Sequence, residues 1–397
     1  MSSELDQSAI DEVAARIDGE LVGLRRALHR CPELAGGERR TAALVAERLR
    51  AAGLAVTTGV GGHGVVAVLS GAGPGPTVAY RADMDAVDED EQYAGEFASQ
   101  VPGAAHLCGH DLHTAIGVGI AEVLAQLRER LNGKVVLLFQ PAEETLAGAR
   151  AMLEDGVLER TAPQEIYALH CGPLPVGTLA VMPGTGLPGQ DRFRIELSGS
   201  AAGDAGKRLT DLIDGFSTIR HPQSPGEFQQ LLEDLRTPDG PLERFVFARS
   251  QLTWTDERAE VRAWLRAWPD SRYAEIRDEL RSAVDALPDA RITFQGPPFP
   301  AMVCSPELSE AAAAHLRGVL GAHAVMVQHA AFPFNGEDFA LFLQRLPGAM
   351  FILGVADPEA GLNGIPHSPD FAADETAIGV GVRSMAGFLS SRLAALA

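Results

Sequence analysis

The sequence predicts an α/β protein: a main domain with a mostly parallel, helix-flanked sheet, and a smaller α+β domain inserted into it. Two observations predict the sheet. Short, nearly continuous apolar segments such as KVVLLFQ at 134–140 are typical of strands buried in a parallel sheet. These segments alternate with stretches of helical spacing, as expected where helices cover both faces. A third observation predicts the insertion, because residues 191–296 change to strands of alternating polarity.

The first part of the chain contains the first helices and strands of the main domain. Residues 41–53 have helical spacing and end at Gly53, a residue that commonly terminates helices. Strands follow at 64–71 and at 76–87, and the second of them runs into acidic residues. An amphipathic helix near the start is predicted by one apolar stripe, formed by Ile10, Val13, Ile17, Leu21 and Leu24.

The main domain continues with a helix and three strands. Apolar residues recur at helical spacing over 115–131, and Asn132-Gly133 ends that helix. The predicted strands that follow it are 134–140, 165–170 and 349–355.

The predicted insertion has the element order β-α-β-β-α-β, which is typical of a small α+β sandwich with helices on one face of its sheet. Gly- and Pro-rich stretches at 182–190 and 295–302 flank it and resemble hinges. The predicted domains are therefore 1–187 and 298–397 for the main domain and 188–297 for the insertion. The predicted elements of the insertion are 191–200, 208–219, 243–255, 258–268, 272–287 and 290–296.

Composition excludes several classes of protein. The 397 residues carry a formal charge of −20, so the chain repels phosphate backbones and nucleic-acid binding is not expected. No apolar run approaches the roughly 18 residues that span a bilayer, so no membrane association is expected. The first 30 residues lack a basic segment followed by an apolar one, so we expect no export and a cytoplasmic protein.

The four cysteines are far apart in the sequence. They show no CxxC spacing, which fits a reducing compartment and argues against a disulfide framework. The spacing also argues against a structural zinc knuckle, which needs a second close pair of ligands. We expect Cys31, Cys171 and Cys304 to be small buried apolar residues, and Cys108 to belong to a site.

Polar side chains gather where predicted buried strands end. In open α/β sheets, ligands bind at the carboxyl edge of the strands. Five or more ligand-capable groups on one such edge predict a metal site. The groups are Asp83, Asp85, Cys108, His110, Glu143, Glu144, His170 and His367.

The spacings within this set have a chemical meaning. Cys108 and His110 are two residues apart, so in an extended segment both project to the same side and can bind one metal. Glu143 and Glu144 are adjacent and project apart, so one can coordinate metal while the other faces a bound water. A thiolate, imidazoles and carboxylates together suit Zn, Mn, Co or Ni better than Mg or Ca.

Each residue has a simpler interpretation when it is taken alone. The Glu143–Glu144 pair could be solvated, His170 could be a satisfied core histidine, and the aspartates could form a turn. A cysteine hydrolase that uses Cys108 as nucleophile is a further alternative, but His110 is too close in sequence for a comfortable partner base. The remaining histidines are interpreted as structural or solvated, with His106 and His113 at most behind the ligands.

Several segments together resemble a known family. RADMDAV, HLCGHDLHTA, FQPAEE, ALHCGP and PHSPDF are similar to the signature segments of the M20 metallopeptidases, and most similar to the amidohydrolase branch. This branch includes aminoacylases, hippurate hydrolases and hydrolases of indole-acetyl amino acids. The resemblance covers nearly the whole chain, and the segments occur in the family's order.

The resemblance implies a metal-dependent amidohydrolase that cleaves the amide bond of an N-acyl amino acid, or of a related small amide or peptide, with a metal-activated water. It implies two divalent metals per chain, and an inserted domain that serves as a lid and as the contact of a homodimer. It implies Glu143 as general base and Asp85 as the acidic residue that orients a ligand. The metal ligands that it implies are Cys108, His110, Glu144, His170 and His367.

The inserted domain departs from the family pattern. Gly203 stands where relatives carry a lid histidine, and the usual asparagine-containing segment is unrecognisable near 250–257. Leu112 stands where relatives usually carry glycine. We therefore expect an atypical substrate, with Arg262 or Arg266, or else Arg220 and His221, replacing the histidine. The alternative is a non-catalytic relative that keeps the metal pocket and acts as a binding protein.

Overall fold

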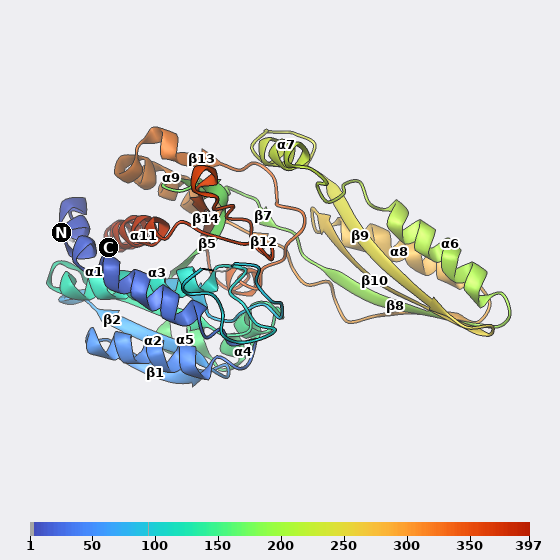
Figure 1. Cartoon of the computed structure of the whole chain (residues 1–397), viewed down its shortest axis with the longest axis horizontal. Coiled ribbons are helices and arrows are strands. Elements are labelled where there is room, and N and C mark those ends of the chain that lie inside the picture. The colour runs from blue at the N-terminus through green and yellow to red at the C-terminus, as the bar shows by residue number, and fades with distance from the viewer. Residues whose placement is uncertain (1–3, 94) are drawn as a thin grey trace. The chain divides into compact units, whose positions relative to one another are not determined.

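The computed structural model describes residues 4–93 and 95–397, and these fold into two compact units (Figure 1). The larger unit comprises the chain up to Pro183, together with Cys304–Val327 and Leu341–Ala397. The smaller unit comprises Gly184–Val303 and Gln328–Ala340. Its second segment lies outside the insertion predicted at 188–297. Residues 1–3, at the start of the predicted N-terminal segment, lie outside the described residues.

The larger unit is built on an eight-stranded sheet in the order β1-β2-β4-β3-β5-β14-β6-β13. The four central strands β4, β3, β5 and β14 pair in parallel, whereas β1, β2 and the β14–β6 contact are antiparallel. The predicted α/β class with a mostly parallel sheet is confirmed. The strands are β1 (Ala55–Val60), β2 (Gly64–Ser70), β3 (Gly73–Asp83), β4 (Asn132–Gln140), β5 (Glu165–Pro175), β6 (Leu179–Val181), β13 (Val325–Val327) and β14 (Gly348–Ala356).

Helices α3 (His110–Gln126) and α11 (Thr376–Leu396) pack against the central strands, and α1 (Gln7–His29) packs on both helices. The apolar stripe predicted for α1 is buried, and its N-cap Asp6 accepts a hydrogen bond from the backbone N–H of Ser8. The other helices outside the smaller sheet are α2 (Arg39–Ala51), α4 (Gly148–Glu154), α5 (Val157–Thr161), α9 (Pro306–Leu320), α10 (Ala340–Leu343) and the short 3-10 helices Arg128–Arg130, Ala322–Ala324 and Pro358–Ala360.

Helix α3 begins five residues before the predicted start at 115. Gly109 precedes it with a φ of 78°, a left-handed conformation that glycine adopts readily, and this turns the chain directly into the helix. The first turn is buried but polar, so it lacks the apolar periodicity on which the prediction depended. The turn therefore presents ligand-capable side chains at the carboxyl edge of the sheet.

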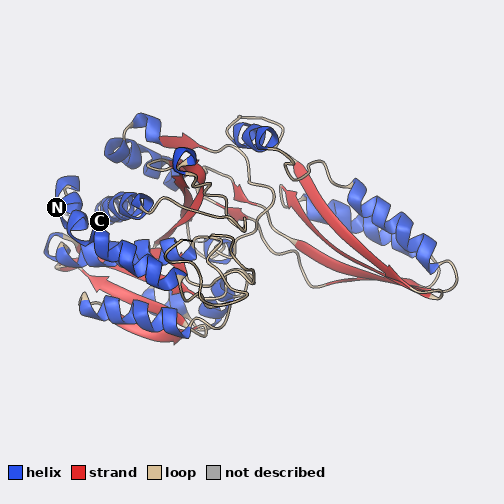
Figure 2. Cartoon of the chain, viewed as in Figure 1, coloured by secondary structure: helices blue, strands red, loops and turns tan. Residues whose placement is uncertain are grey.

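The smaller unit contains an antiparallel sheet in the order β11-β8-β10-β9. Helices α6 and α8 cover one face of it and bury an apolar core (Figures 1 and 2). The predicted β-α-β-β-α-β order is observed, with one additional helix, α7. The elements are β8 (Asp191–Ser198), α6 (Ala202–Gly215), α7 (Pro225–Leu235), β9 (Phe245–Trp254), β10 (Arg258–Trp268), α8 (Arg272–Asp285) and β11 (Ala290–Phe294), with a separate pair β7 (Gly186–Leu187) and β12 (Met302–Val303).

Helix α7 was missed because it is short and mostly exposed. Its start has a clear signal, since Ser224 caps the backbone N–H of Glu227 at 3.2 Å and Pro225 occupies the first turn. Its apolar residues Leu231 and Leu235 are buried in a small separate cluster with Phe245. Over the described residues, no helix combines the length and apolarity needed to cross a membrane.

Candidate metal centre

The candidate site lies at the carboxyl ends of the central strands. Strand β3 ends at Asp83 and strand β4 at Gln140, and His170, in the middle of β5, is level with the end of β3 because Arg81 pairs with Ala168. Because neighbouring parallel strands end at the same edge, the residues that follow them meet there. His367 comes from a loop after β14, and its backbone N–H donates to the Leu107 carbonyl at 2.8 Å. That bond holds the loop beside the segment that precedes α3.

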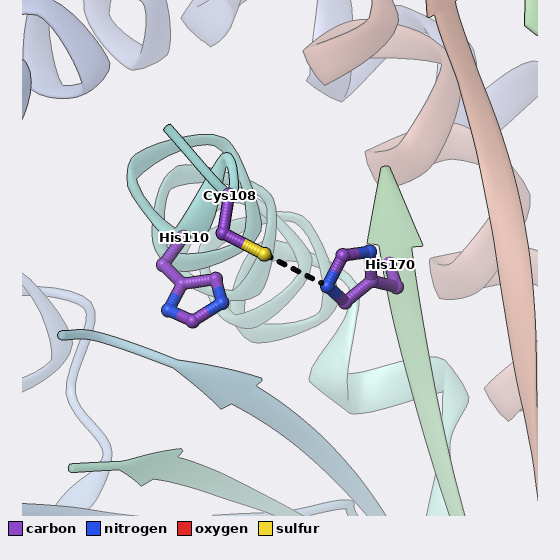
Figure 3. A group of neighbouring side chains, drawn as sticks. All are labelled: Cys108, His110 and His170. Atoms are coloured by element: carbon purple, nitrogen blue, oxygen red, sulfur yellow. Dashed lines mark hydrogen bonds between the residues drawn. The ribbon is translucent and has the colours of Figure 1, made fainter. Parts of the chain in front are cut away.

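Cys108, His110 and His170 form the first group of ligand-capable side chains. The Cys108 sulfur is directed at the His170 ring, 3.4 Å from its Nε2, with the His110 ring beside them (Figure 3). One ligand atom from each residue lies within 4.8 Å of the others, a separation that a single metal ion can bridge. Cys108 and His110 are buried.

A second group shares Cys108 and adds Glu144 and His367. The Glu144 carboxylate lies 3.6 Å from His367 Nε2 and 3.8 Å from His110 Nε2. The His367 side chain is 41% exposed, so this side of the site is open to solvent. The structure therefore brings all five predicted ligands into two adjoining groups.

His110 is oriented by the segment after β3. Its Nδ1 lies 2.9 Å from the backbone carbonyl of Asp85, which can only accept, so Nδ1 carries the proton. Nε2 therefore faces the cluster, and this buried atom has no hydrogen-bond partner among the described residues. A buried, unpartnered ring nitrogen that can give up its proton beside a thiol and carboxylates fits a metal ligand.

Asp85 also fixes the turn that carries the two glutamates. One of its carboxylate oxygens accepts the backbone N–H of Glu143 and the other accepts that of Glu144, both at 3.0 Å. The Glu143 carboxylate lies 3.9 Å from His110 Nε2, at the edge of the same cluster. Asp85 thus lies behind the ligands and orients the turn and His110 together.

Asp83, one of the predicted site groups, and His113, predicted to lie at most behind the ligands, brace the site. Asp83 lies 2.6 Å from His113 Nδ1 and also pairs with the Arg81 guanidinium. His113 Nε2 accepts the backbone N–H of Cys171 at 2.8 Å, so both His113 nitrogens are engaged. Asp83 and His113 come close enough to other ligand-type atoms to form metal-binding groups, but these hydrogen bonds make them supports. Asp83 was predicted as a site group because it follows a buried strand, and the structure places it as a support behind the ligands.

Sequence analysis did miss Glu38, which also supports the site. This buried carboxylate accepts the backbone N–H of Gly36 at 2.8 Å and that of Ala142 at 2.9 Å. Ala142 has a φ of 52°, in the left-handed region that costs a non-glycine residue energy, and the Glu38 bond helps to hold that turn. The turn leads directly into Glu143.

The electrostatics of the site favour a cation. Burial by itself lowers the pKa of His110, but the neighbouring Asp83 and Asp85 raise it to about 10. Burial raises the pKa of the Cys108 thiol, and Glu144 raises it further. Burial and the nearby His113 lower the pKa of His170, so its ring is neutral and able to coordinate. A bound metal would therefore displace protons from His110 and Cys108.

The candidates in the smaller unit have different surroundings. Gly203 lies in the first turn of α6. Arg220 pairs with Glu227 at 2.7 Å, and the His221 ring stacks on Phe334 with 4.2 Å between centroids. Arg262 likewise has a local partner, Glu260 at 2.5 Å, and its side chain is exposed on the sheet face that α6 and α8 leave uncovered.

Comparison with known proteins identifies the family. Residues 79–391 match Peptidase family M20/M25/M40. The chain is 31% identical over 392 residues to the putative amidohydrolase YhaA of Bacillus subtilis, covering 95% of this chain and 96% of that protein. It is 30% identical over 382 residues to the N-acetyl-L-cysteine deacetylase of the same organism, covering 91% of this chain and 85% of that protein.

Solved structures agree with this assignment. The Bacillus subtilis YXEP protein, described as a dinuclear metal binding peptidase from the M20 family, has a TM-score of 0.77 at 29% identity, covering 96% of this chain and 99% of that one. A putative aminohydrolase from methicillin-resistant Staphylococcus aureus has a TM-score of 0.83 at 26% identity, covering 98% of this chain and all (100%) of that one. The chain therefore belongs to peptidase family M20/M25/M40 and is a metal-dependent hydrolase of C–N bonds.

Proposed function

We propose that this protein is an amidohydrolase that removes the acyl group from an N-acyl amino acid or a closely related small amide. The observation that carries the proposal is the pair of ligand groups that share Cys108, with Glu143 at their edge. Relatives named as N-acetylcysteine and N-acetyldiaminopimelate deacetylases support this substrate class.

We assign the metal ligands as Cys108, His110, Glu144, His170 and His367. The mixed thiolate, imidazole and carboxylate set suits two divalent transition ions, of Zn, Mn, Co or Ni. The unpartnered Nε2 of His110 supports this assignment. When bound, such ions lower the pKa of a coordinated water and polarise the amide carbonyl.

In this proposal Glu143 is the general base. Its carboxylate takes a proton from the attacking water and later delivers that proton to the leaving amine. Asp85 acts through position, because its two backbone hydrogen bonds fix how Glu143 and Glu144 face the cluster. His367 is the most exposed of the five assigned ligands. We also propose that the protein forms a homodimer through the smaller unit, as its family resemblance implies.

The test compares two adjacent glutamates. Glu143→Gln should retain bound metal and lose turnover by a factor of roughly 100 to 10,000, the usual contribution of a general base. Glu144→Gln should instead lower the metal content itself. Glu154→Gln, on the exposed side of α4, is the matched control and should change neither. Elemental analysis and a panel of N-acyl amino acids give the two readouts.

Two results would contradict the assignment. Protein purified without chelators that holds less than about a tenth of an equivalent of metal, and takes up none of the four ions, would remove the metal site. A Glu143→Gln variant with the wild-type rate would remove Glu143 as the base.

A second candidate is a relative that binds its ligand without turning it over. Gly203 stands where the family resemblance implies a lid histidine, and this departure favours the second candidate. The two candidates separate in a broad screen of amides, because the binding protein would hold metal and ligand yet release no product.

A further inference from the structure

The smaller unit has a second feature that the proposed reaction does not use. Helices α6 and α8 cover one face of the sheet, and the opposite face carries a cluster of arginines. Strand register places Arg194 of β8 directly opposite Arg262 of β10. In the next row of the same face, two residues along each strand, Trp264 of β10 lies between Arg192 of β8 and Arg249 of β9. Four guanidinium groups therefore share two adjacent rows of one sheet face, which we call the arginine face.

This arrangement is electrostatically costly without a ligand. Like charges directly opposite on an antiparallel pair are destabilising. Arg194 and Arg262 have partial compensation from Glu196, at 3.7 Å, and Glu260, at 2.5 Å. Arg192 and Arg249 form no salt bridge with any residue that the structure describes. Uncompensated positive charge thus collects at one place on a chain whose net charge is −20.

The arginine face is hollowed. A pocket of about 730 Å³ is bounded by the four arginines and Trp264, and its lining is completed by Phe193, Ala263 and Phe294 and by four polar residues. Small-molecule sites typically enclose roughly 300–1,000 Å³. The added polar groups are Ser250, Gln251, Thr293 and Gln295.

The lining has the chemistry of an anion site. Guanidinium groups bind phosphate and carboxylate through paired, charge-assisted hydrogen bonds. The Arg249 guanidinium lies 4.7 Å from the centre of the Phe247 ring, a stacking contact that limits its freedom. The half-buried Trp264 provides an apolar surface between Arg192 and Arg249 for the rest of a ligand.

We propose that the arginine face binds a small, multiply charged organic anion through phosphate or carboxylate groups. Two observations favour a compact anion over a nucleic acid or a long acidic peptide. Glu196 and Glu260 occupy the next row of the same face and repel an anion that extends past it. The overall charge of −20 also repels any long polyanion. All lining residues belong to the smaller unit, and none is an assigned metal ligand.

Isothermal titration calorimetry on the full-length, metal-replete protein tests the proposal, with tripolyphosphate and a benzene tricarboxylate as probes. We expect saturable binding of about one equivalent per chain by at least one probe, and the tighter probe identifies the anionic group. Arg192→Gln and Arg249→Gln should each weaken binding about tenfold or more, the usual effect of losing a hydrogen bond to a charged group. Arg208→Gln, on exposed α6, is the matched control and should bind like wild type.

Further variants separate this site from the metal centre and from misfolding. Both probes can chelate metal, so binding at the metal centre must be distinguished from binding at the arginine face. The His367→Ala variant is altered only at the metal centre and should therefore bind both probes as tightly as wild type. Arg192→Lys keeps the charge and loses the planar fork, so it should weaken binding by less than Arg192→Gln does. Wild-type affinity in both glutamine variants, or loss of binding in His367→Ala, would overturn the proposal. Tighter binding of an acidic peptide or a single-stranded oligonucleotide than of either probe would also overturn it.

Discussion

The indole ring of Trp254 lies against the backbone of Gly203. A Cβ atom placed on Gly203 would be 3.2 Å from Trp254 Cδ1, closer than an ordinary van der Waals contact. Trp254 ends strand β9 with its side chain on the same side of the sheet as α6, and the residue is 57% exposed. The Lys207 ammonium, one turn further along α6, lies 5.6 Å from the same ring. A side chain at position 203 would therefore meet the indole ring, which would have to shift by a few tenths of an ångström to admit it.

This contact predicts that the two positions are energetically coupled. Gly203→Ala should stabilise α6 by up to about 1 kcal/mol when Trp254 is also alanine, because alanine favours helix over glycine. In the wild-type background the gain should be smaller or reversed, since the indole must move. Urea unfolding of both single variants and the double variant measures the coupling, which should be about 0.5 kcal/mol or more. Additive effects within about 0.3 kcal/mol would show that Trp254 does not hinder a side chain at position 203.

Gly203 also affects which substrates we expect, because the family resemblance places a lid histidine at this position. A lid histidine supplies a hydrogen-bond donor, and loss of one such donor typically costs roughly 2.7–4 kcal/mol of transition-state stabilisation. We therefore expect the metal-replete protein to hydrolyse simple N-acetyl and N-benzoyl amino acids about 100-fold more slowly than its best substrate in a panel of bulkier amides and dipeptides. A kcat/KM above about 10⁴ M⁻¹s⁻¹ on the simple compounds would show that no lid histidine is needed.

Asp85→Asn should affect the metal centre without removing a ligand. Both Asp85 oxygens accept backbone N–H groups, and an amide offers only one acceptor atom, so the Glu143 or Glu144 bond is lost. We expect metal affinity to fall about 10- to 100-fold, as for other groups that orient ligands, and stability to fall by about 1–3 kcal/mol. Metal-binding titrations against a competing chelator measure the first effect. Asp88→Asn, on the exposed segment after β3, serves as control; equal affinities in the two variants would contradict the role of Asp85.

The predicted ligands were recognisable because each stands at a strand end or in a distinctive segment. Apolar runs such as 134–140 mark buried strands, and the edge where they end is fixed by parallel pairing. One supporting residue was hidden for a physical reason. Glu38 acts by accepting the backbone N–H groups of Gly36 and Ala142. Ala142 is 104 residues away from Glu38 in the sequence, and no local pattern encodes a hydrogen bond over that separation. The arginine face was equally hidden, because alternation in β8 and β10 shows that each strand has a polar side without showing which arginines lie opposite each other.

The last prediction concerns a buried network that joins α1 to α3. His29 Nδ1 lies 2.8 Å from the Asp111 carboxylate and its Nε2 lies 2.8 Å from Glu91, while Arg25 also contacts Asp111 at 2.7 Å. Burial by itself lowers the pKa of His29, but Asp111 and Glu91 together raise it above its ordinary value of 6.5. The stabilisation from charged His29 is therefore complete below about pH 6.5 and is lost as the pH rises through the raised folded value.

We accordingly expect His29→Gln to lower the melting temperature most at about pH 6, with the deficit shrinking toward about pH 9 as wild-type His29 loses its proton. Comparing the two proteins at each pH, both metal-replete, removes the pH dependence that they share at the metal centre. His323→Gln, on an exposed 3-10 helix, provides the matched histidine control and should follow the wild-type curve. A deficit in His29→Gln that stays constant across this range would mean that His29 contributes through packing and hydrogen bonds alone, and that its charge does not hold α1 to α3.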